Sequence, residues 1–491
     1  MLAVSNTAWY DQPTPVNSQG SAKPKSAGGV ADPKGRGLRR ELSIRDLTLF
    51  GIVCLTGPRW IPEAAHAGPG SVTLWLLAAL LFGAPLAVAV AALMSKHRGA
   101  GGLYTWTRND FGPAHGFVAF WVYWAGMAFW FPSAAVFYLS STAYAFGDAY
   151  AHLADSRAFL ICGSLAAIWI ALGSNLVGLK TGKWVENFGA VAVAMLGAVL
   201  IAAAAVHWNH HGSATALHLT PKMDWGTAAF WAAIAYGISG VEYFGMMSDE
   251  IRSPERTVKP AVWLATGFVA VFYAATTLAL LVLLKPEAIS EIRGIADGGE
   301  AIATVFAAPW ISAAIGLLLL TQGFGAFGGV GTAISRMPFA AGADGLLPDA
   351  FGRVHSRWQT PHVALITLGV VSSVLLLVSQ LGDTMRAAYQ EMVSMTFIGG
   401  FLPYIYIFMS AWKAKRKVAA ALGLGVTMFC LACSVVPTSQ VTNVWLFEGK
   451  LALGTAAMIG SGLLLYARGR ARTNATRPAP TQPALLDYPV I

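Results

Sequence analysis

Long apolar segments bounded by short polar stretches repeat along the chain from about residue 45 to residue 467. Each has about the 20 residues that a helix needs to cross ~30 Å of hydrocarbon. No stretch shows the alternation of apolar and polar residues that membrane strands require. The pattern predicts an all-α integral membrane protein with twelve transmembrane helices. The predicted helices are residues 45–66, 71–94, 113–146, 157–176, 184–206, 226–248, 260–284, 308–335, 361–379, 387–411, 417–437 and 444–467.

Composition and charge argue against a soluble protein and against a nucleic-acid partner. Charged residues make up only 12% of the 491 residues, whereas soluble domains average about 25%. The net charge of +9 is spread over short loops and both tails, so we expect no nucleic-acid binding. Lys and Arg concentrate in alternate loops, which by the positive-inside rule places both termini in the cytoplasm. We expect a multi-pass protein of the inner (plasma) membrane, with a disordered cytoplasmic tail at 1–40 and a cytoplasmic tail at 468–491.

Two predicted helices carry residues that interrupt a helix at mid-span. The first contains Gly57 and Pro58, and proline has no backbone N–H and disfavours helix in the residue before it. The sixth contains Gly237 and Gly240, which lack the side chains that enforce helix. Interrupted helices five apart are expected of two inverted five-helix repeats, a leucine-transporter-like fold. The expected parts are a first repeat at 41–206 (helices 1–5), a second at 226–411 (helices 6–10), and helices 11–12 at 417–467.

The two interruptions together predict a binding site. Bare peptide groups in lipid cost several kcal/mol each, and in transporters the substrate and water satisfy them near the midplane. Helix N-termini favour a carboxylate and helix C-termini a cation, which suits the head group of an amino acid. The alternative is two ordinary kinks packed against neighbours. The expected backbone contacts are Thr56, Gly57 and Arg59 at the first interruption, and Ile238, Ser239, Gly240 and Val241 at the second.

Four stretches, in the expected order and topology, resemble the amino acid–polyamine–organocation permease superfamily. The resemblance covers roughly residues 38 to 410 and implies an inverted-repeat fold with sodium-independent, proton-coupled uptake or substrate exchange. The stretches are "LRRELSIRDLTLFGI" before and into the first helix, "SKHRGAGGLYTWTRNDFGPAHGF" after the second, "DEIRSPERTVKPAV" after the sixth and "SRMPFAAGADGLLPDAFGRVHSRWQTP" after the eighth.

Within this superfamily the chain is most similar to the glutamate/γ-aminobutyrate antiporter branch. That likeness rests on Arg59 soon after the first interruption and on the Trp-x-Pro of Trp130 and Pro132. The typical first-helix signature "GSGIF" is replaced by "TGPRW", which leaves the substrate open. A cation at the midplane repels a polycation, so Arg59 favours acidic or neutral amino acids over polyamines.

Charges within predicted membrane helices are costly and usually functional or paired. Arg59 either binds a substrate carboxylate through its fork or pairs with Glu242 or Glu63. Glu242 carries a coupled proton only if no such pair forms. Glu186, near the cytoplasmic end of the fifth helix, is expected to be solvated. Five aromatic residues are candidate gates of the site, with Tyr236 and Phe324 favoured because they lie beside glycines; the five are Trp60, Tyr123, Trp130, Tyr236 and Phe324.

The predicted function is secondary active transport of amino acids or related amines by alternating access. Two alternatives stay open: a membrane sensor of the same fold that binds an amino acid without moving it, and a polyamine carrier. The helices contain no catalytic constellation, so we expect no enzymatic activity. Cys430 and Cys433 lie in an apolar run without a second pair or a nearby His, so we expect packing roles, no metal and no cofactor. The sequence does not distinguish a monomer from a homo-oligomer.

Overall fold

The computed structural model describes residues 40–476 except 98, 100, 222–227, 291, 380–384 and 437–442. The predicted tail at 1–40 lies outside the described residues apart from Arg40, as does the tail at 468–491 beyond Thr476. The described residues are helical, apart from loops and one isolated β-bridge between Leu42 and Ile251. Ten of their helices are long and apolar enough to cross a membrane.

These ten helices correspond to ten of the twelve predicted segments. Their bounds are Gly70–Ala78 (α3) continuing through the π-helical η1 (Ala79–Gly83) into α4 (Ala84–Lys96), α6 (Pro113–Ala145), α8 (Arg157–Leu176), α9 (Leu179–His211), α12 (Pro254–Leu283), α14 (Trp310–Ile334) with α15 (Arg336–Ala343), α16 (His362–Ser379), α17 (Met385–Lys413), α18 (Lys417–Ser434) and α19 (Val444–Thr476).

The two remaining segments, 45–66 and 226–248, each contain a pair of shorter helices. The first pair is α1 (Ile44–Leu55) and α2 (Trp60–His66), and the second is α10 (Ala228–Gly237) and α11 (Tyr243–Met246). A capping box between Ser43 and Asp46 starts α1, as the local sequence favours. The short elements elsewhere are α5 (Leu103–Phe111), α7 (Asp148–Ala151), η2 (His152–Asp155), η4 (Ser248–Glu250), η5 (Pro286–Ala288) and α13 (Gly294–Val305).

Glycine contacts bring the central helices close together. A Cβ atom on Gly126 of α6 would lie 2.7 Å from Cα of Gly399 on α17. A Cβ on Gly189 of α9 would lie 2.8 Å from Cα of Gly325 on α14. Small residues of this kind let membrane helices approach to backbone contact. The pairs α6–α17 and α9–α14 therefore pack tightly, and α1 lies against α9, α12 and α14.

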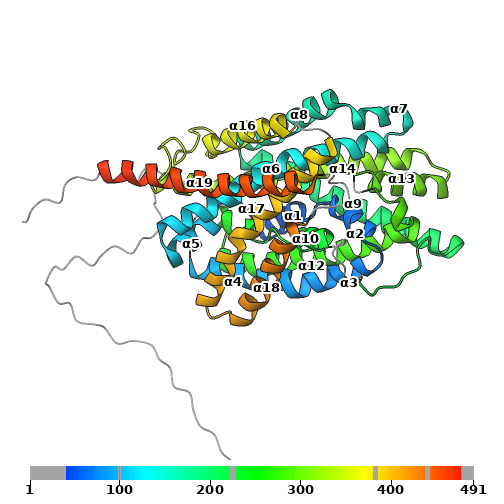
Figure 1. Cartoon of the computed structure of the whole chain (residues 1–491), viewed down its shortest axis with the longest axis horizontal. Helices are drawn as coiled ribbons and strands as arrows, with labels where there is room; N and C mark the ends of the chain where they lie inside the picture. Colours follow the sequence, from blue (N-terminus) through cyan, green and yellow to red (C-terminus); the bar gives the residue numbers. More distant parts are fainter. Residues whose placement is uncertain are drawn as a thin grey trace, which may run out of the picture.

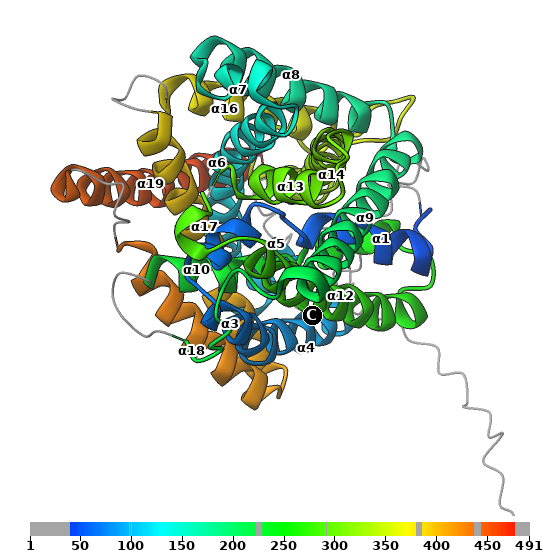
Figure 2. The same cartoon turned by 90° about the vertical axis from the view of Figure 1, so that its right-hand side faces the viewer.

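The helices run roughly along the long axis of the molecule, with α4 and α5 toward one end and α3, α7 and α13 toward the other (Figure 1). Viewed from the end, α8 and α16 lie at one edge and α18 at the opposite edge (Figure 2). Apolar side chains face outward, which suits lipid. Strongly exposed examples include Leu80, Leu264, Val271, Leu453 and Leu464.

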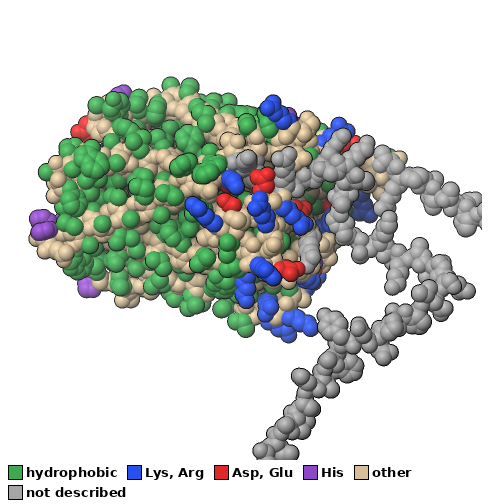
Figure 3. Space-filling view, turned by 180° about the vertical axis from the view of Figure 1, so that it is seen from behind, with side chains coloured by type: hydrophobic (Ala, Val, Ile, Leu, Met, Phe, Trp, Pro, Cys, Tyr) green, Lys and Arg blue, Asp and Glu red, His purple; other side chains and the backbone are tan. Residues whose placement is uncertain are grey.

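Charged side chains lie apart from this apolar surface. Figure 3 shows Lys and Arg gathered at one end of the face in view, while hydrophobic side chains cover most of the rest. In the loop around α5, Lys96 donates to Asp110 at 2.7 Å and His97 lies 3.3 Å from the same carboxylate. Burial acts to raise the pKa of Asp110, but the Lys96 hydrogen bond and the neighbouring His97 outweigh it, so the pKa falls below the usual 3.8.

The strand-like bridge ties the start of α1 to the segment after α11. The N–H groups of Glu41 and Leu42 donate to the carbonyl of Glu250 at 2.9 and 3.0 Å. In return, the N–H of Arg252 donates to the carbonyl of Leu42 at 3.0 Å. The two ends are thus joined by three backbone hydrogen bonds.

Candidate functional site

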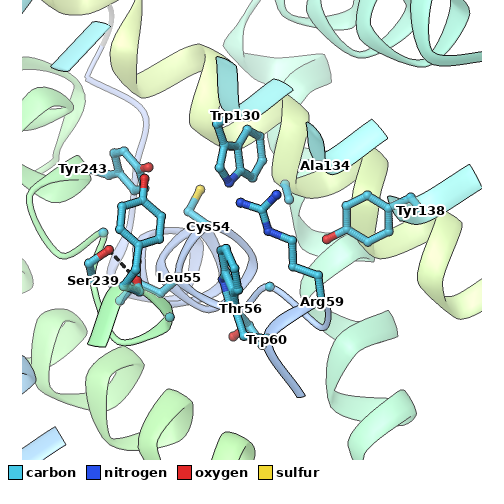
Figure 4. A pocket seen from close by; sticks show the side chains of 15 residues that line it. Cys54, Leu55, Thr56, Arg59, Trp60, Trp130, Ala134, Tyr138, Ser239 and Tyr243 are labelled. Atoms are coloured by element: carbon cyan, nitrogen blue, oxygen red, sulfur yellow. Dashed lines mark hydrogen bonds between the residues drawn. The ribbon is translucent and has the colours of Figure 1, made fainter. Parts of the chain in front are cut away.

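The non-helical residues 56–59 and 238–242 face each other in the interior. Between them lies a small cavity of about 30 Å³, room for roughly two water molecules. Arg59 from the first interruption, Trp60 from α2 and Trp130 from α6 project toward this cavity (Figure 4). Small-molecule pockets usually measure about 300–1,000 Å³, so a ligand larger than water needs side chains to move. The lining residues are Cys54, Leu55, Thr56, Gly57, Arg59, Trp60, Trp130, Ala134, Tyr138, Tyr236, Gly237, Ser239, Gly240, Tyr243 and Ala326.

Side chains from other helices satisfy backbone groups at the first interruption. The N–H of Gly57 donates to the hydroxyl of Tyr273 on α12 at 2.7 Å. The amide of Gln322 on α14 donates to the carbonyl of Thr56 at 2.7 Å, and the Tyr138 hydroxyl donates to the Gln322 carbonyl oxygen. Three buried polar side chains thus hold the backbone in its non-helical path.

The second interruption depends on a glycine and a tyrosine. Gly240 has φ +101°, a conformation that other residues rarely adopt. Its N–H lies 3.4 Å from the hydroxyl of Tyr404 on α17. Tyr404 also donates to Glu242 at 2.8 Å, and Tyr123 of α6 donates to the same carboxylate oxygen. The Ser239 hydroxyl donates to the carbonyl of Tyr236 at 2.6 Å (Figure 4).

Arg59 is buried with part of its hydrogen-bonding capacity unused. Only 2% of the residue is exposed, and its guanidinium carbon lies 4.0 Å from the centroid of the Trp60 ring. Nη1 donates to the hydroxyl of Ser133 at 3.0 Å, while Nη2 has no hydrogen-bond partner. The carboxylate of Glu242 accepts instead from Tyr123 and Tyr404. The guanidinium therefore presents a free donor edge to an anion.

An aromatic cluster closes one side of the cavity. The centroids of Trp60 and Phe397 lie 5.5 Å apart, those of Tyr236 and Phe397 5.0 Å, and those of Trp60 and Tyr236 5.9 Å. Beyond this cluster is a second small pocket, which Glu63 and Ser394 help to line. The three rings come from α2, α10 and α17, so movement of α2 or α10 would separate them.

Comparison with known proteins shows the family of the chain. The sequence profile of the amino acid permease family matches residues 43–449. The chain belongs to the amino acid permease family. This confirms the resemblance to the amino acid–polyamine–organocation superfamily, and the protein is a multi-pass membrane transporter.

Relatives of this permease are transporters as well. An uncharacterized transporter of Legionella pneumophila is 24% identical over 84% of this chain and 93% of its own length. The inner membrane transporter YjeM of Salmonella typhimurium is 23% identical over 84% and 90%. The b(0,+)-type amino acid transporter 1 of Oryctolagus cuniculus is 21% identical over 67% of each chain. The crystal structure of MhsT in complex with L-phenylalanine superposes with a TM-score of 0.58 at 15% identity, covering 88% of the permease and all of MhsT. The permease therefore shares the fold of MhsT.

The structure brings most of the predicted site residues together. Thr56, Gly57, Arg59, Trp60, Tyr236, Ser239 and Gly240 all line the cavity. Ile238 and Val241 are buried and are not among the residues that line the cavity, and Ile238 packs near Gly83 of η1. Glu242 lies just behind the cavity, held by two tyrosines.

Phe324 was a candidate gate and does not line the cavity. It lies in a separate apolar pocket with Leu139 and Gly163, between α14, α6 and α8. Phe327, almost one turn further along α14, packs on Trp130 instead, with ring centroids 5.5 Å apart. The expectation failed because the sequence does not fix which face of an apolar helix points inward.

Sequence reasoning missed the residues that support the site from afar. Tyr273, Tyr404, Phe397 and Ser133 come from α12, α17 and α6, and each is an unremarkable residue in an apolar run. No local pattern relates them to the interruptions. Gln322 was visible as a rare polar residue of its helix, but its partner Thr56 is 266 positions away.

Proposed function

We propose that this permease carries amino acids across the inner membrane by alternating access. The observation that carries the proposal is the buried guanidinium edge of Arg59 between two non-helical backbone segments. Nη2 of Arg59 would bind the substrate carboxylate, because a charge-assisted hydrogen bond satisfies an otherwise unpartnered donor. The carbonyls that end α1 and α10 would receive the ammonium group. MhsT, which shares the fold, has been crystallised in complex with L-phenylalanine, an amino acid.

The helix arrangement supports an inverted-repeat mechanism. Counting α1 with α2 and α10 with α11 as two interrupted spans gives twelve spans with the ten long helices. Repeats of five would then occupy residues 41–206 and 226–411, and the interrupted spans would rock against α6, α9, α14 and α17. The aromatic cluster of Trp60, Tyr236 and Phe397 would close the outer side and open when α2 and α10 tilt.

The orientation follows from charge. The end of the molecule rich in Lys and Arg (Figure 3) would face the cytoplasm by the positive-inside rule. Both termini would then be cytoplasmic. Relatives named as inner membrane transporters support the same location.

Coupling to protons or to a second substrate is the remaining part of the proposal. Glu242 accepts hydrogen bonds from two tyrosine hydroxyls, which would hold its carboxylate in place behind the cavity. Likeness to the glutamate/γ-aminobutyrate antiporter branch favours sodium-independent exchange. Arg59 disfavours polyamines, since it would repel a polycation in a low-dielectric site.

Uptake into proteoliposomes tests the proposal. Purified protein is first screened by thermal shift against the twenty amino acids, γ-aminobutyrate and putrescine. The strongest stabiliser is then measured in radiolabelled form, with and without the same compound inside the vesicles. Uptake above that of empty liposomes supports transport. Stabilisation without uptake in either condition would indicate a sensor, and stabilisation by putrescine alone would overturn the carboxylate role of Arg59.

A further inference from the structure

Glu186 of α9 is a buried carboxyl that the site does not use. Only 1% of the residue is exposed, so the expectation of a solvated side chain was wrong. The error arose because nearness to the helix end does not reveal that this face of α9 packs on α14. Its Oε1 atom is buried and has no hydrogen-bond partner.

A second oxygen without a partner faces the same small space. Oδ1 of Asn175 on α8 is also buried and unpartnered, while its Nδ2 donates to the carbonyl of Gly328 at 2.5 Å. A Cβ atom added to Gly182 would lie 2.6 Å from Asn175 Oδ1 and 3.8 Å from Glu186 Oε1. Both oxygens therefore flank Gly182, and the glycine leaves the room between them.

A buried ion pair lies beside this space. Arg336, at the start of α15, donates to Glu250 of η4 at 2.7 Å, and the two side chains are 2% and 3% exposed. Arg336 also donates to the carbonyl of Thr332 at 2.5 Å. Its Nε and the Oε2 of Glu250 have no hydrogen-bond partner. Among the described residues Arg336 forms an ion pair with Glu250 and not with Glu186.

The charges around Glu186 decide its protonation. From packed elements it faces the Arg336 cation, the Glu250 and Asp46 carboxylates and the Cys54 thiol of α1. On the same helix as Glu186, the Lys183 ammonium lies 3.9 Å from the Asp46 carboxylate. Of these groups Arg336 is the buried cation, and it is already paired with Glu250. A buried carboxylate without an ion-pair partner costs several kcal/mol, and such a group takes up a proton instead.

Glu250 belongs to a different moving part of the protein from Glu186 and Arg336. Glu250 is joined to the start of α1 by the backbone bonds at Leu42, so it moves with the interrupted helices. Glu186 lies on α9, and Arg336 begins α15 directly after α14. Helices α9 and α14 pack at backbone contact through Gly189 and Gly325. Opening of the cytoplasmic side would separate Glu250 from Arg336 and leave Arg336 beside Glu186.

We propose that Glu186 is the proton-binding residue of the transport cycle and that Arg336 exchanges Glu250 for Glu186 when the cytoplasmic side opens. With the cytoplasmic side closed and the outer side open, Glu186 takes up a proton from outside water and is a neutral carboxylic acid. On opening, its O–H bond breaks, the proton passes to cytoplasmic water, and the carboxylate left behind pairs with Arg336. Glu250 leaves as a hydrated carboxylate. The inference rests on the proposed transport function and names its coupling ion.

Infrared spectroscopy of the purified full chain tests the protonation without any substrate. At neutral pH we expect wild type to show the C=O stretch of a protonated carboxyl that Glu186→Gln lacks. Glu250→Gln should lose the same band, because Arg336 then turns to Glu186. Glu391→Gln, which removes a surface carboxylate 2.5 Å from Lys450, is the matched control and keeps the band.

Each other infrared result overturns part of the proposal. A band equal in wild type and Glu186→Gln overturns the proton site. A band retained in Glu250→Gln overturns the exchange of Arg336. The measurement is repeated with sodium replaced by choline, and a band present only in choline would indicate a bound sodium ion instead. Glu186→Asp keeps a carboxyl and should keep a shifted band, which guards against misfolding of the glutamine variant.

Transport assays distinguish proton coupling from the movement of substrate across the membrane. Proteoliposomes are given an equimolar radiolabelled mixture of the twenty amino acids. With one proton per substrate, a one-unit inward pH gradient should drive about tenfold accumulation in wild type and none in Glu186→Gln, which should still exchange with preloaded substrate. Wild type without uptake would refute the proposed function, while the infrared band still reports on Glu186. Accumulation unchanged in Glu186→Gln would refute the present inference alone.

Discussion

Replacing Arg59 by methionine should weaken substrate binding without harming the fold. The aliphatic stem of methionine keeps the contact with the Trp60 ring, which now lies 4.0 Å from the guanidinium carbon. Ser133 keeps its own bond to the carbonyl of Trp130 at 3.0 Å. Nη2 of Arg59 has no hydrogen-bond partner, and the charge of Arg59 is expensive to bury. The substrate-free variant should therefore melt at the same temperature as wild type or higher.

The expected loss of affinity for the amino acid follows from the unpartnered Nη2 donor of Arg59. A hydrogen bond to a charged group contributes about 1.5–3 kcal/mol, and every 1.4 kcal/mol is about tenfold in affinity. Removal of the guanidinium should thus raise the Kd of an amino acid by about 10- to 150-fold. Arg59→Lys should recover only part of this, because an ammonium lacks the planar fork.

The assay compares the affinity of a ligand that has a carboxylate with that of a ligand that lacks it. The Kd is measured for the best amino acid of the thermal-shift panel and for its decarboxylated amine, on wild type and on both variants. If Arg59 holds the carboxylate, the loss appears for the amino acid and vanishes for the amine. An equal loss for both ligands, or none for either, would refute the carboxylate assignment. A lower melting temperature without ligand would show that the guanidinium supports the fold.

Three further variants test the fold. Tyr273→Phe leaves the Gly57 N–H without its acceptor at 2.7 Å and should cost about 1–3 kcal/mol, measured as a lower thermal midpoint. Gly126→Leu places a side chain where Gly399 Cα lies 2.7 Å from a Cβ, so size-exclusion chromatography should show loss of the monodisperse peak. Because the pKa of Asp110 is lowered from 3.8, its stabilisation relative to Asp110→Asn should be present above pH 3.8 and be lost as the pH falls through the folded value. A pH-independent difference in thermal midpoint would contradict this.

The sequence predicts those features of the fold that depend on local rules. Apolar length locates the long helices, because only about 20 residues of helix satisfy their own backbone across the bilayer. Local chemistry also explains where helix stops: Pro58 cannot donate a backbone hydrogen bond, and Gly240 adopts φ +101°. The resemblance to the family rests on four short stretches, and the profile match over residues 43–449 confirms the family.

The site depends on relations that no local rule contains. Gly57 bonds to Tyr273 across 216 positions of sequence, and a tyrosine in an apolar run gives no sign of its partner. Phe324 was named as a gate because it lies beside glycines, yet it is Phe327 on α14 that packs against Trp130. Burial of Glu186 likewise depends on which face of α9 meets α14. Such features are set by tertiary packing, which periodicity in an all-apolar helix cannot resolve.

The unpaired charge at the site has a consequence for the transport cycle. An empty carrier must change conformation with the Arg59 cation uncompensated, whereas a loaded carrier moves with the carboxylate in place. Since a buried charge pair costs less than a lone buried charge, the loaded form should cross between the two sides faster. We expect uptake of the best amino acid to rise several-fold when the vesicles contain the same compound, and Arg59→Met to abolish this stimulation. Equal rates with empty and preloaded wild-type vesicles would mean that the guanidinium finds another counter-charge during the return step.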